Sequence, residues 1–185
     1  MYTRMKALGS LCVIAIVLTG CSSGPAFRPD PKPTAVELAE TAPEDFAIAV
    51  TVYSVMTDRA NWSTLPRPRR PARYVLEPDG VLRAAVGPSA DRQEFPPVMR
   101  ELSPSDVEDI WRLVQTGGLF KADLPGIIGS PRELIVRRSR PTAMVELAGA
   151  GERRLIATPL ATQDTPAPEL ERVIDRLAML AWQPQ

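Results

Sequence analysis

The fold is decided by residues 73–86, RYVLEPDGVLRAAV. Two apolar runs flank Pro78-Asp79-Gly80. Proline suits the first central position of a turn, aspartate suits the next, and glycine suits the position that needs a positive φ. The stretch therefore predicts a β-hairpin with strands over 73–77 and 81–86.

Further strands are expected on both sides of this hairpin. Residues 46–53, FAIAVTVY, alternate so that Phe46, Ile48, Val50 and Val52 share one face, which is typical of a half-buried strand. The pattern also predicts strands over 133–138, 142–148 and 152–158, and the sequence Gly-Ala-Gly at 149–151 indicates a turn between the last two.

Two segments have the periodicity of amphipathic helices. Ser103 can cap the first helix, Pro104 suits its first turn, and Gly117-Gly118 can end it. Its apolar positions are Val107, Ile110, Trp111 and Val114. The second helix is expected to open at Pro168, with apolar positions Leu170, Val173, Ile174, Leu177, Ala178 and Ala181. We expect Trp111 in the core and Trp182 packed at the end of the second helix.

Grouped hairpins with interspersed helices indicate the α+β class. We expect an antiparallel sheet of about five to six strands, with two helices packed on one face. Residues 46–185 then form a single globular domain, in which loops are expected over 57–71, 88–101 and 121–132.

The first 20 residues have the three parts of an export signal. Arg4 and Lys6 provide a basic start, residues 11–18 form an apolar run of 8 residues, and small residues follow. A membrane-spanning helix needs about 20 apolar residues, so this run is too short to be one.

Leu18-Thr19-Gly20-Cys21 resembles the lipobox of bacterial lipoproteins. The resemblance implies that a diacylglycerol is joined to the sulfur of Cys21, and that Cys21 becomes the first residue of the mature protein. The expected location is the cell envelope, outside the cytoplasm, with the membrane as a partner through the lipid. In a Gram-negative cell, Ser22 favours the outer membrane. The alternative is an ordinary secretory signal with an accidental cysteine.

Residues 21–45 are interpreted as the lipidated cysteine and a tether. Prolines recur at positions 25, 29, 31, 33 and 43. Such a sequence favours an extended, semi-rigid chain of about 3.1 Å per residue. The tether would lift the domain away from the bilayer.

Composition excludes several classes of function. The 185-residue chain has no histidine, which excludes Ser-His and Cys-His catalysis and histidine-ligated zinc. Cys12 leaves with the leader, so Cys21 is the only thiol of the mature chain, and neither an internal disulfide nor a thiolate metal site is expected. The mature part keeps 20 basic and 22 acidic residues, a balance that argues against nucleic-acid binding. No metal or other cofactor is expected.

Four basic residues gather near the predicted hairpin: Arg67, Arg69, Arg70 and Arg73. They are candidates for contact with an anionic partner, such as lipid phosphate, a cell-wall polymer or an acidic envelope protein. The alternative is a solvated, proline-rich loop.

No catalytic residue is predicted. Without histidine or a second thiol, catalysis would depend on carboxylates, lysine or serine. Asp106 and Asp109 are expected on one side of a helix, and Glu133 and Glu146 lie in predicted strands. These carboxylates leave a hydrolase as an alternative function. The sequence contains no glycine-rich phosphate loop and no calcium loop.

The globular part also resembles emfourin-type inhibitors of thermolysin-like metalloproteases. The resemblance rests on residues 78–82 at the hairpin turn, the Ser103-capped helix with Leu113, residues 118–120, and the closing amphipathic helix. It implies an order of elements, and protease inhibition as an alternative function. The first hypothesis remains a non-enzymatic envelope lipoprotein that binds an envelope protein or a cell-wall component.

Overall fold

The computed structural model describes residues 41–54, 62–88, 90–121, 140–163 and 166–182. The predicted leader, Cys21 and most of the predicted tether lie outside the described residues, as does the strand predicted over 133–138. Within the described part of the chain, no helix is long and apolar enough to cross a membrane.

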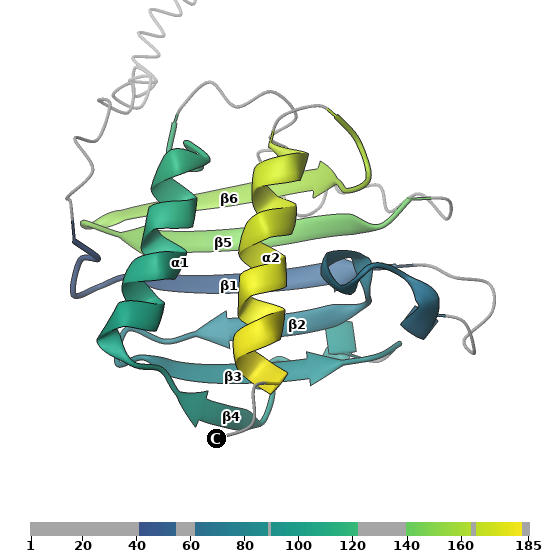
Figure 1. The fold of residues 1–185 in the computed structure, drawn as a ribbon, viewed down its shortest axis with the longest axis horizontal. Coiled ribbons are helices and arrows are strands. Elements are labelled where there is room, and N and C mark those ends of the chain that lie inside the picture. Colours follow the sequence, from purple (N-terminus) through teal and green to yellow (C-terminus); the bar gives the residue numbers. More distant parts are fainter. Residues whose placement is uncertain (1–40, 55–61, 89, 122–139, 164–165, 183–185) are drawn as a thin grey trace, which may run out of the picture. The chain divides into compact units, whose positions relative to one another are not determined.

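A six-stranded antiparallel sheet organises the domain, and two helices cross one of its faces (Figure 1). The strands are β1 (Ala47–Tyr53), β2 (Ala72–Leu76), β3 (Val81–Val86), β4 (Val98–Glu101), β5 (Thr142–Gly149) and β6 (Glu152–Pro159). Their order in the sheet is β4-β3-β2-β1-β5-β6, and every neighbouring pair is antiparallel. The expected α+β fold, with two helices on one face, is confirmed.

The core lies between the sheet and the helices. Phe46 and the alternate residues of β1 that follow it are at most 2% exposed, and the neighbouring strands add Tyr74, Leu76, Leu82, Val145 and Leu147 to the same layer. The register explains this layer, because Val50 is paired with both Tyr74 and Val145. The period-2 pattern of the sequence therefore identifies the buried face.

Helix α1 (Pro104–Thr116) begins as the sequence indicates. The backbone N–H of Asp106 donates to Ser103 Oγ at 3.2 Å, and Ser103 Oγ donates to Asp106 Oδ2 at 2.7 Å. Trp111 packs edge-on against Phe46 and Phe120, with ring centroids 5.0 and 5.7 Å away. The expected core position of Trp111 is confirmed.

Helix α2 (Ala167–Trp182) buries all six of its predicted apolar positions. An ion pair fixes it beside α1, because Arg176 Nη2 lies 2.9 Å from Asp106 Oδ1 and 3.1 Å from Asp109 Oδ2. Near the C-terminal end of α2, Arg100 of β4 donates to the carbonyl of Leu180 at 3.2 Å. The two helices are thus held to each other and to the edge of the sheet.

The two predicted hairpins close with turns of the expected chemistry. Gly80 has a φ of +84°, and the N–H of Val81 donates to Asp79 Oδ1 at 3.1 Å. Ala150 and Gly151 join β5 to β6 with φ values of 53° and 76°, as a tight two-residue hairpin turn requires. The backbone N–H groups of Gly151 and Ala150 donate to the Asp45 carboxylate at 2.7 Å each and lower its pKa below the usual value.

The structure corrects two expectations. The predicted loop over 88–101 contains the 3-10 helix η3 (Ala90–Arg92) and the strand β4, which pairs with β3 through Val81 and Glu101. Trp182 does not pack into the core at the end of α2, since 60% of it is exposed. Trp182 continues the apolar stripe of α2, but it is the last residue of the helix and lies beyond the buried residues of the core.

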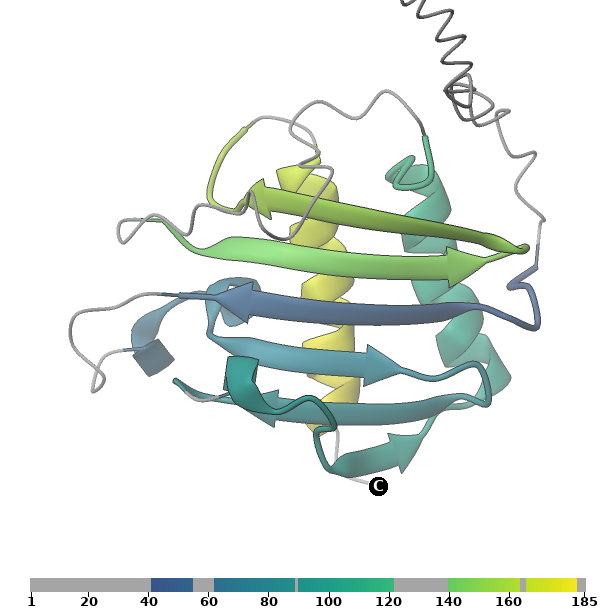
Figure 2. The same cartoon turned by 180° about the vertical axis from the view of Figure 1, so that it is seen from behind.

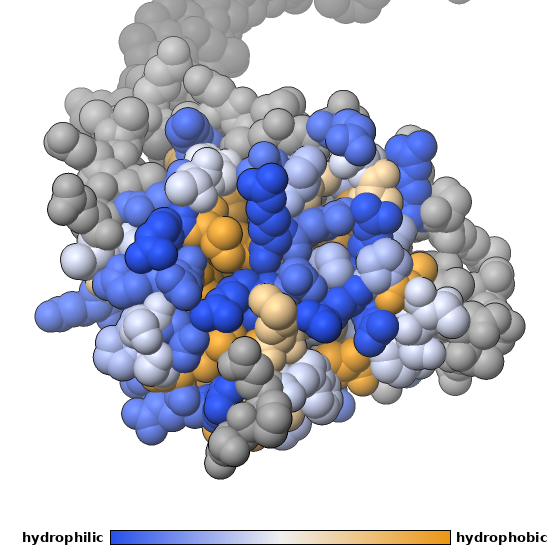
Figure 3. All heavy atoms as spheres, in the orientation of Figure 1, coloured by the Kyte–Doolittle hydropathy of each residue, from blue (hydrophilic) through white to orange (hydrophobic). Residues whose placement is uncertain are grey.

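The two faces of the sheet differ in what covers them. The face that carries α1 and α2 presents a largely hydrophilic surface, with apolar areas between charged side chains (Figure 3). Among the residues that the structure describes, only η3 and the segment that follows it lie over the other face (Figure 2). We call this second face the open face.

Candidate binding site

The loop between β1 and β2 carries the arginines singled out in the sequence. Its described part, residues 62–71, contains two short 3-10 helices, η1 (Trp62–Thr64) and η2 (Arg67–Arg69). Prolines at 66, 68 and 71 favour such turns because each fixes its φ near −65°. We call residues 62–71 the arginine loop; it lies beside α2, on the helix-bearing side of the sheet (Figure 1).

Two arginines hold this loop against α2. Arg69 donates from Nε and Nη2 to the two carboxylate oxygens of Glu171, at 3.0 and 3.1 Å. Arg67 Nη1 lies 3.4 Å from Asp175 Oδ1 in a more exposed pair. A two-pronged arginine–carboxylate pair is well oriented, so Arg69 positions the loop.

The other two arginines lie on opposite sides of the sheet. Arg70 donates from Nε to the carbonyl of Leu65 at 2.9 Å, which leaves the end of its guanidinium without a partner among the described residues. Arg73 donates from Nη1 to Thr51 Oγ1 at 2.6 Å on the open face. The structure therefore brings Arg67, Arg69 and Arg70 together and separates Arg73 from them.

A cleft of about 550 Å³ lies between the arginine loop and the end of α2. Arg67 and Arg70 line it together with two tryptophans, Trp62 from the arginine loop and Trp182 from the end of α2. The complete lining is Trp62, Arg67, Arg70, Tyr74, Val86, Ala178, Met179 and Trp182. The cleft therefore combines two guanidinium groups with aromatic and apolar surface.

Tyr74 lines the cleft and is 1% exposed, so the pKa of its hydroxyl responds to the charges around the cleft. Burial raises the pKa of the Tyr74 hydroxyl to about 12, while the positive charges of Arg70 and Arg67 act in the opposite direction. The side chain is therefore neutral near pH 7, and the fixed charges beside it are two arginines and Asp175. Such a site is suited to a carboxylate or phosphate group beside an apolar part.

The carboxylates considered for catalysis do not converge. Asp106 and Asp109 are joined by Arg176 between the helices, whereas Glu146 lies on the open face. Glu133 is outside the described residues. No group of three or more metal-binding side chains occurs among the residues that the structure describes.

Comparisons with known proteins add no family to this description. No protein-family model matches the chain, and no curated protein matches it significantly. The resemblance to emfourin-type inhibitors and the protease inhibition that it implies both stay predictions.

The sequence indicated only part of the cleft. The charges of Arg67 and Arg70 indicate a binding role, and Trp62 precedes them in the same loop. Tyr74 could be assigned to the buried side of β2 from its phase with Leu76. The sequence does not place Met179 or Trp182 beside the loop, because their proximity to it depends on the packing of α2.

Proposed function

We propose that this protein is a lipid-anchored cell-envelope protein whose α+β domain binds an anionic partner without catalysing a reaction on it. The observation that carries the proposal is the convergence of Arg67 and Arg70 with Trp62 and Trp182 on one cleft. The proposed lipid anchor rests on the leader and on the lipobox-like sequence at its end. The arrangement supports a binding module held close to a membrane.

Anchoring through Cys21 would place the domain outside the cytoplasm. More than one acyl chain on the N-terminal cysteine makes release from a bilayer slow, because a single chain gives only marginal binding. In a Gram-negative cell, the residue after the cysteine favours the outer membrane. The partners within reach are then lipid headgroups, the cell wall and other envelope proteins.

The chemistry of the cleft narrows the choice of ligand. A guanidinium forms paired hydrogen bonds with carboxylate or phosphate oxygens. Tryptophan rings add apolar contact at little cost in conformational entropy, which is why they recur in binding surfaces. The expected ligand is an acidic segment of an envelope protein or an anionic cell-wall fragment that also carries an apolar group.

Cys21→Ser is expected to abolish lipid attachment and to release the protein from the membrane fraction. A serine hydroxyl cannot replace the thiolate as the group that accepts the lipid. The measurement is incorporation of labelled fatty acid in cells, followed by membrane fractionation. Cys12→Ser is the matched control and should keep both properties. Continued labelling of the Cys21→Ser protein contradicts the proposed anchoring.

Replacing Arg67 and Arg70 together by Gln is expected to weaken ligand binding about tenfold or more, since each charge-assisted hydrogen bond contributes about 1.5–3 kcal/mol. Two of the three tryptophans line the cleft, so tryptophan fluorescence reports its occupancy. The probes are an acidic peptide, a carboxylate-bearing cell-wall peptide and glycerophosphoglycerol. Arg112→Gln, on the exposed side of α1, is the control. Equal affinities in the double variant and the control, or no binding of any probe, would overturn the assignment.

A further inference from the structure

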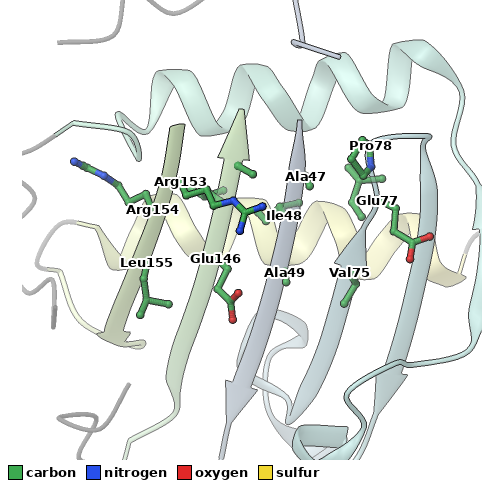
Figure 4. Close-up of a pocket in the computed structure, with 13 residues that line it drawn as sticks. Ala47, Ile48, Ala49, Val75, Glu77, Pro78, Glu146, Arg153, Arg154 and Leu155 are labelled. Atoms are coloured by element: carbon green, nitrogen blue, oxygen red, sulfur yellow. The ribbon is translucent and has the colours of Figure 1, made fainter. Parts of the chain in front are cut away.

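The open face carries a second hollow, of about 570 Å³, on the opposite side of the sheet from the arginine cleft (Figure 4). It spreads over β2, β1, β5 and β6. Its lining on this face is small and apolar along the middle, with Ala47, Ala49, Val75, Ala148 and Leu155. An antiparallel sheet with one solvated face usually alternates apolar and polar residues. Alanine, valine and leucine at these outward positions indicate a face that another surface covers.

Charged side chains border this apolar strip in two pairs. On one side, Glu77 and Arg83 form an ion pair with Nε and Oε1 2.9 Å apart. On the other side lie Glu146 of β5 and Arg153 of β6, and neither has a side-chain partner among the described residues. We call these the first and the second charged pair.

The register fixes where each charge stands relative to β1. In the row of Ala49, the neighbours are Val75 and then Arg83 on one side, and Glu146 on the other. In the row of Ala47, Glu77 is adjacent on the first side, since it follows Leu76, the partner of Ile48. Arg153 lies on the second side of that row, beyond Ala148. Each row therefore has a basic side chain on one side of β1 and an acidic side chain on the other, and the two rows have opposite polarity.

This pattern is complementary to itself. A half-turn about an axis parallel to β1 exchanges the two sides and keeps the rows, as a two-fold interface requires. With the axis along β1, Arg153 of one copy lies one strand spacing, about 4.8 Å, to the side of Glu77 of the other, and Glu146 lies the same distance to the side of Arg83. The long arginine and glutamate side chains can span such an offset. Ala47 and Ala49 lie on the axis, where their small side chains allow two sheets to approach closely.

We propose that the open face is the interface of a homodimer, in which two copies pack sheet against sheet around β1. The occupant of the hollow is the same surface of a second copy. The interface lies on the other side of the sheet from the arginine cleft, so a dimer would leave both clefts free. The inference does not depend on the function proposed for that cleft.

The first test places a cysteine on the expected axis. The full chain carries Cys12→Ser and Cys21→Ser and is purified in mild detergent, so that Ala49→Cys supplies the only thiol. Under a mild oxidant, Ala49→Cys should form a disulfide-linked dimer efficiently. Arg172→Cys, on the exposed side of α2, is the control for random collision. Equal cross-linking of the two variants overturns the proposal.

The second test exchanges charges without changing the net charge. One variant carries Glu77→Arg with Arg83→Glu, which keeps an ion pair of reversed polarity within the chain; the other carries Glu146→Arg with Arg153→Glu. Each variant alone should dimerise about tenfold or more weakly, because like charges then lie within reach of each other across the interface. A mixture of the two should form a heterodimer. In it, the exchanged charges of one variant lie opposite the exchanged charges of the other, and the unchanged charges lie opposite unchanged charges, so every contact is again between opposite charges.

Sedimentation of each variant and of their equimolar mixture measures this outcome, and circular dichroism verifies that both variants are folded. Recovery of dimer only in the mixture supports the interface. A monomeric wild-type chain, or two variants that each dimerise as the wild type does, overturns it. The charge exchange leaves Ala49 unchanged, so the cross-linking and sedimentation results are independent of each other.

Discussion

Trp111→Ala is expected to lower the free energy of unfolding by about 3–5 kcal/mol, the range for removal of a large aromatic side chain from a core. Trp111 is 1% exposed and lies between the rings of Phe46 and Phe120. It therefore joins α1 to the start of β1 and to the segment that follows the helix. A domain of this size is stabilised by about 5–15 kcal/mol in total, so the loss is a large fraction.

The cavity left by this substitution would not collapse easily. Gly149 of β5 lies against the indole, because a Cβ added there would be 3.4 Å from a Trp111 ring carbon and 3.3 Å from Pro43. Backbone on one side and two aromatic rings on the other cannot shift far to fill the space. The cost therefore includes a cavity term in addition to the lost burial of the ring.

Urea unfolding followed by circular dichroism measures the change in stability. Trp182→Ala is the matched control, because it removes the same side chain from a position that is 60% exposed. Its expected effect is within about 0.5 kcal/mol. A Trp111→Ala protein as stable as the Trp182→Ala protein would contradict the assignment of Trp111 to the core.

The fold could be predicted where a local pattern and the global packing agree. The alternation that begins at Phe46 and the Ser103 cap of α1 each indicate an element without reference to the rest of the chain. Strand β4 could not be found in this way. Val98–Glu101 is only 4 residues long and follows Pro96-Pro97, so its strand character depends on pairing with β3. Short edge strands of this kind are decided by tertiary contacts.

For the candidate site, the sequence predicts the arginines but not the other residues that line the cleft. Arg70 and Arg73 are three residues apart, but strand β2 turns Arg73 to the open face while the arginine loop stays beside α2. The phase of Tyr74 with Ala72 and Leu76 already contains this information. The meeting of Trp62 with Trp182 is different, because 120 positions separate them and only the packing of α2 brings them together.

The charged residues of the open face could not be predicted as a group from the sequence, because the register of the strands brings them together. The alternation of the sequence places Ala47 and Ala49 on the second face of β1, but it does not show which residues border them. The charges that matter lie on β3, β5 and β6 and directly after β2, and their rows follow from the register of each strand pair. A shift of one residue in any strand would move its charged side chain to the other face.

Tyr74→Phe is expected to protect the protein from alkaline destabilisation. The folded pKa of Tyr74 is about 12, above its ordinary value of 10.0, because burial disfavours the phenolate. Tyr74 therefore contributes stability that is fully present below pH 10 and is lost as pH rises towards 12. A shift of this size corresponds to about 2–3 kcal/mol, at 1.36 kcal/mol per pKa unit.

Urea unfolding at a series of pH values from 9 to 12 tests this expectation, and the measured quantity is the difference between the wild type and Tyr74→Phe. The chain offers a favourable background, since it contains only 3 tyrosines and 3 lysines, and both variants share the other groups. Tyr53→Phe is the control and should keep the alkaline loss, because it leaves Tyr74 in place. If the wild type and Tyr74→Phe lose stability in parallel up to pH 12, the Tyr74 hydroxyl is hydrated, and the floor of the arginine cleft is open to water.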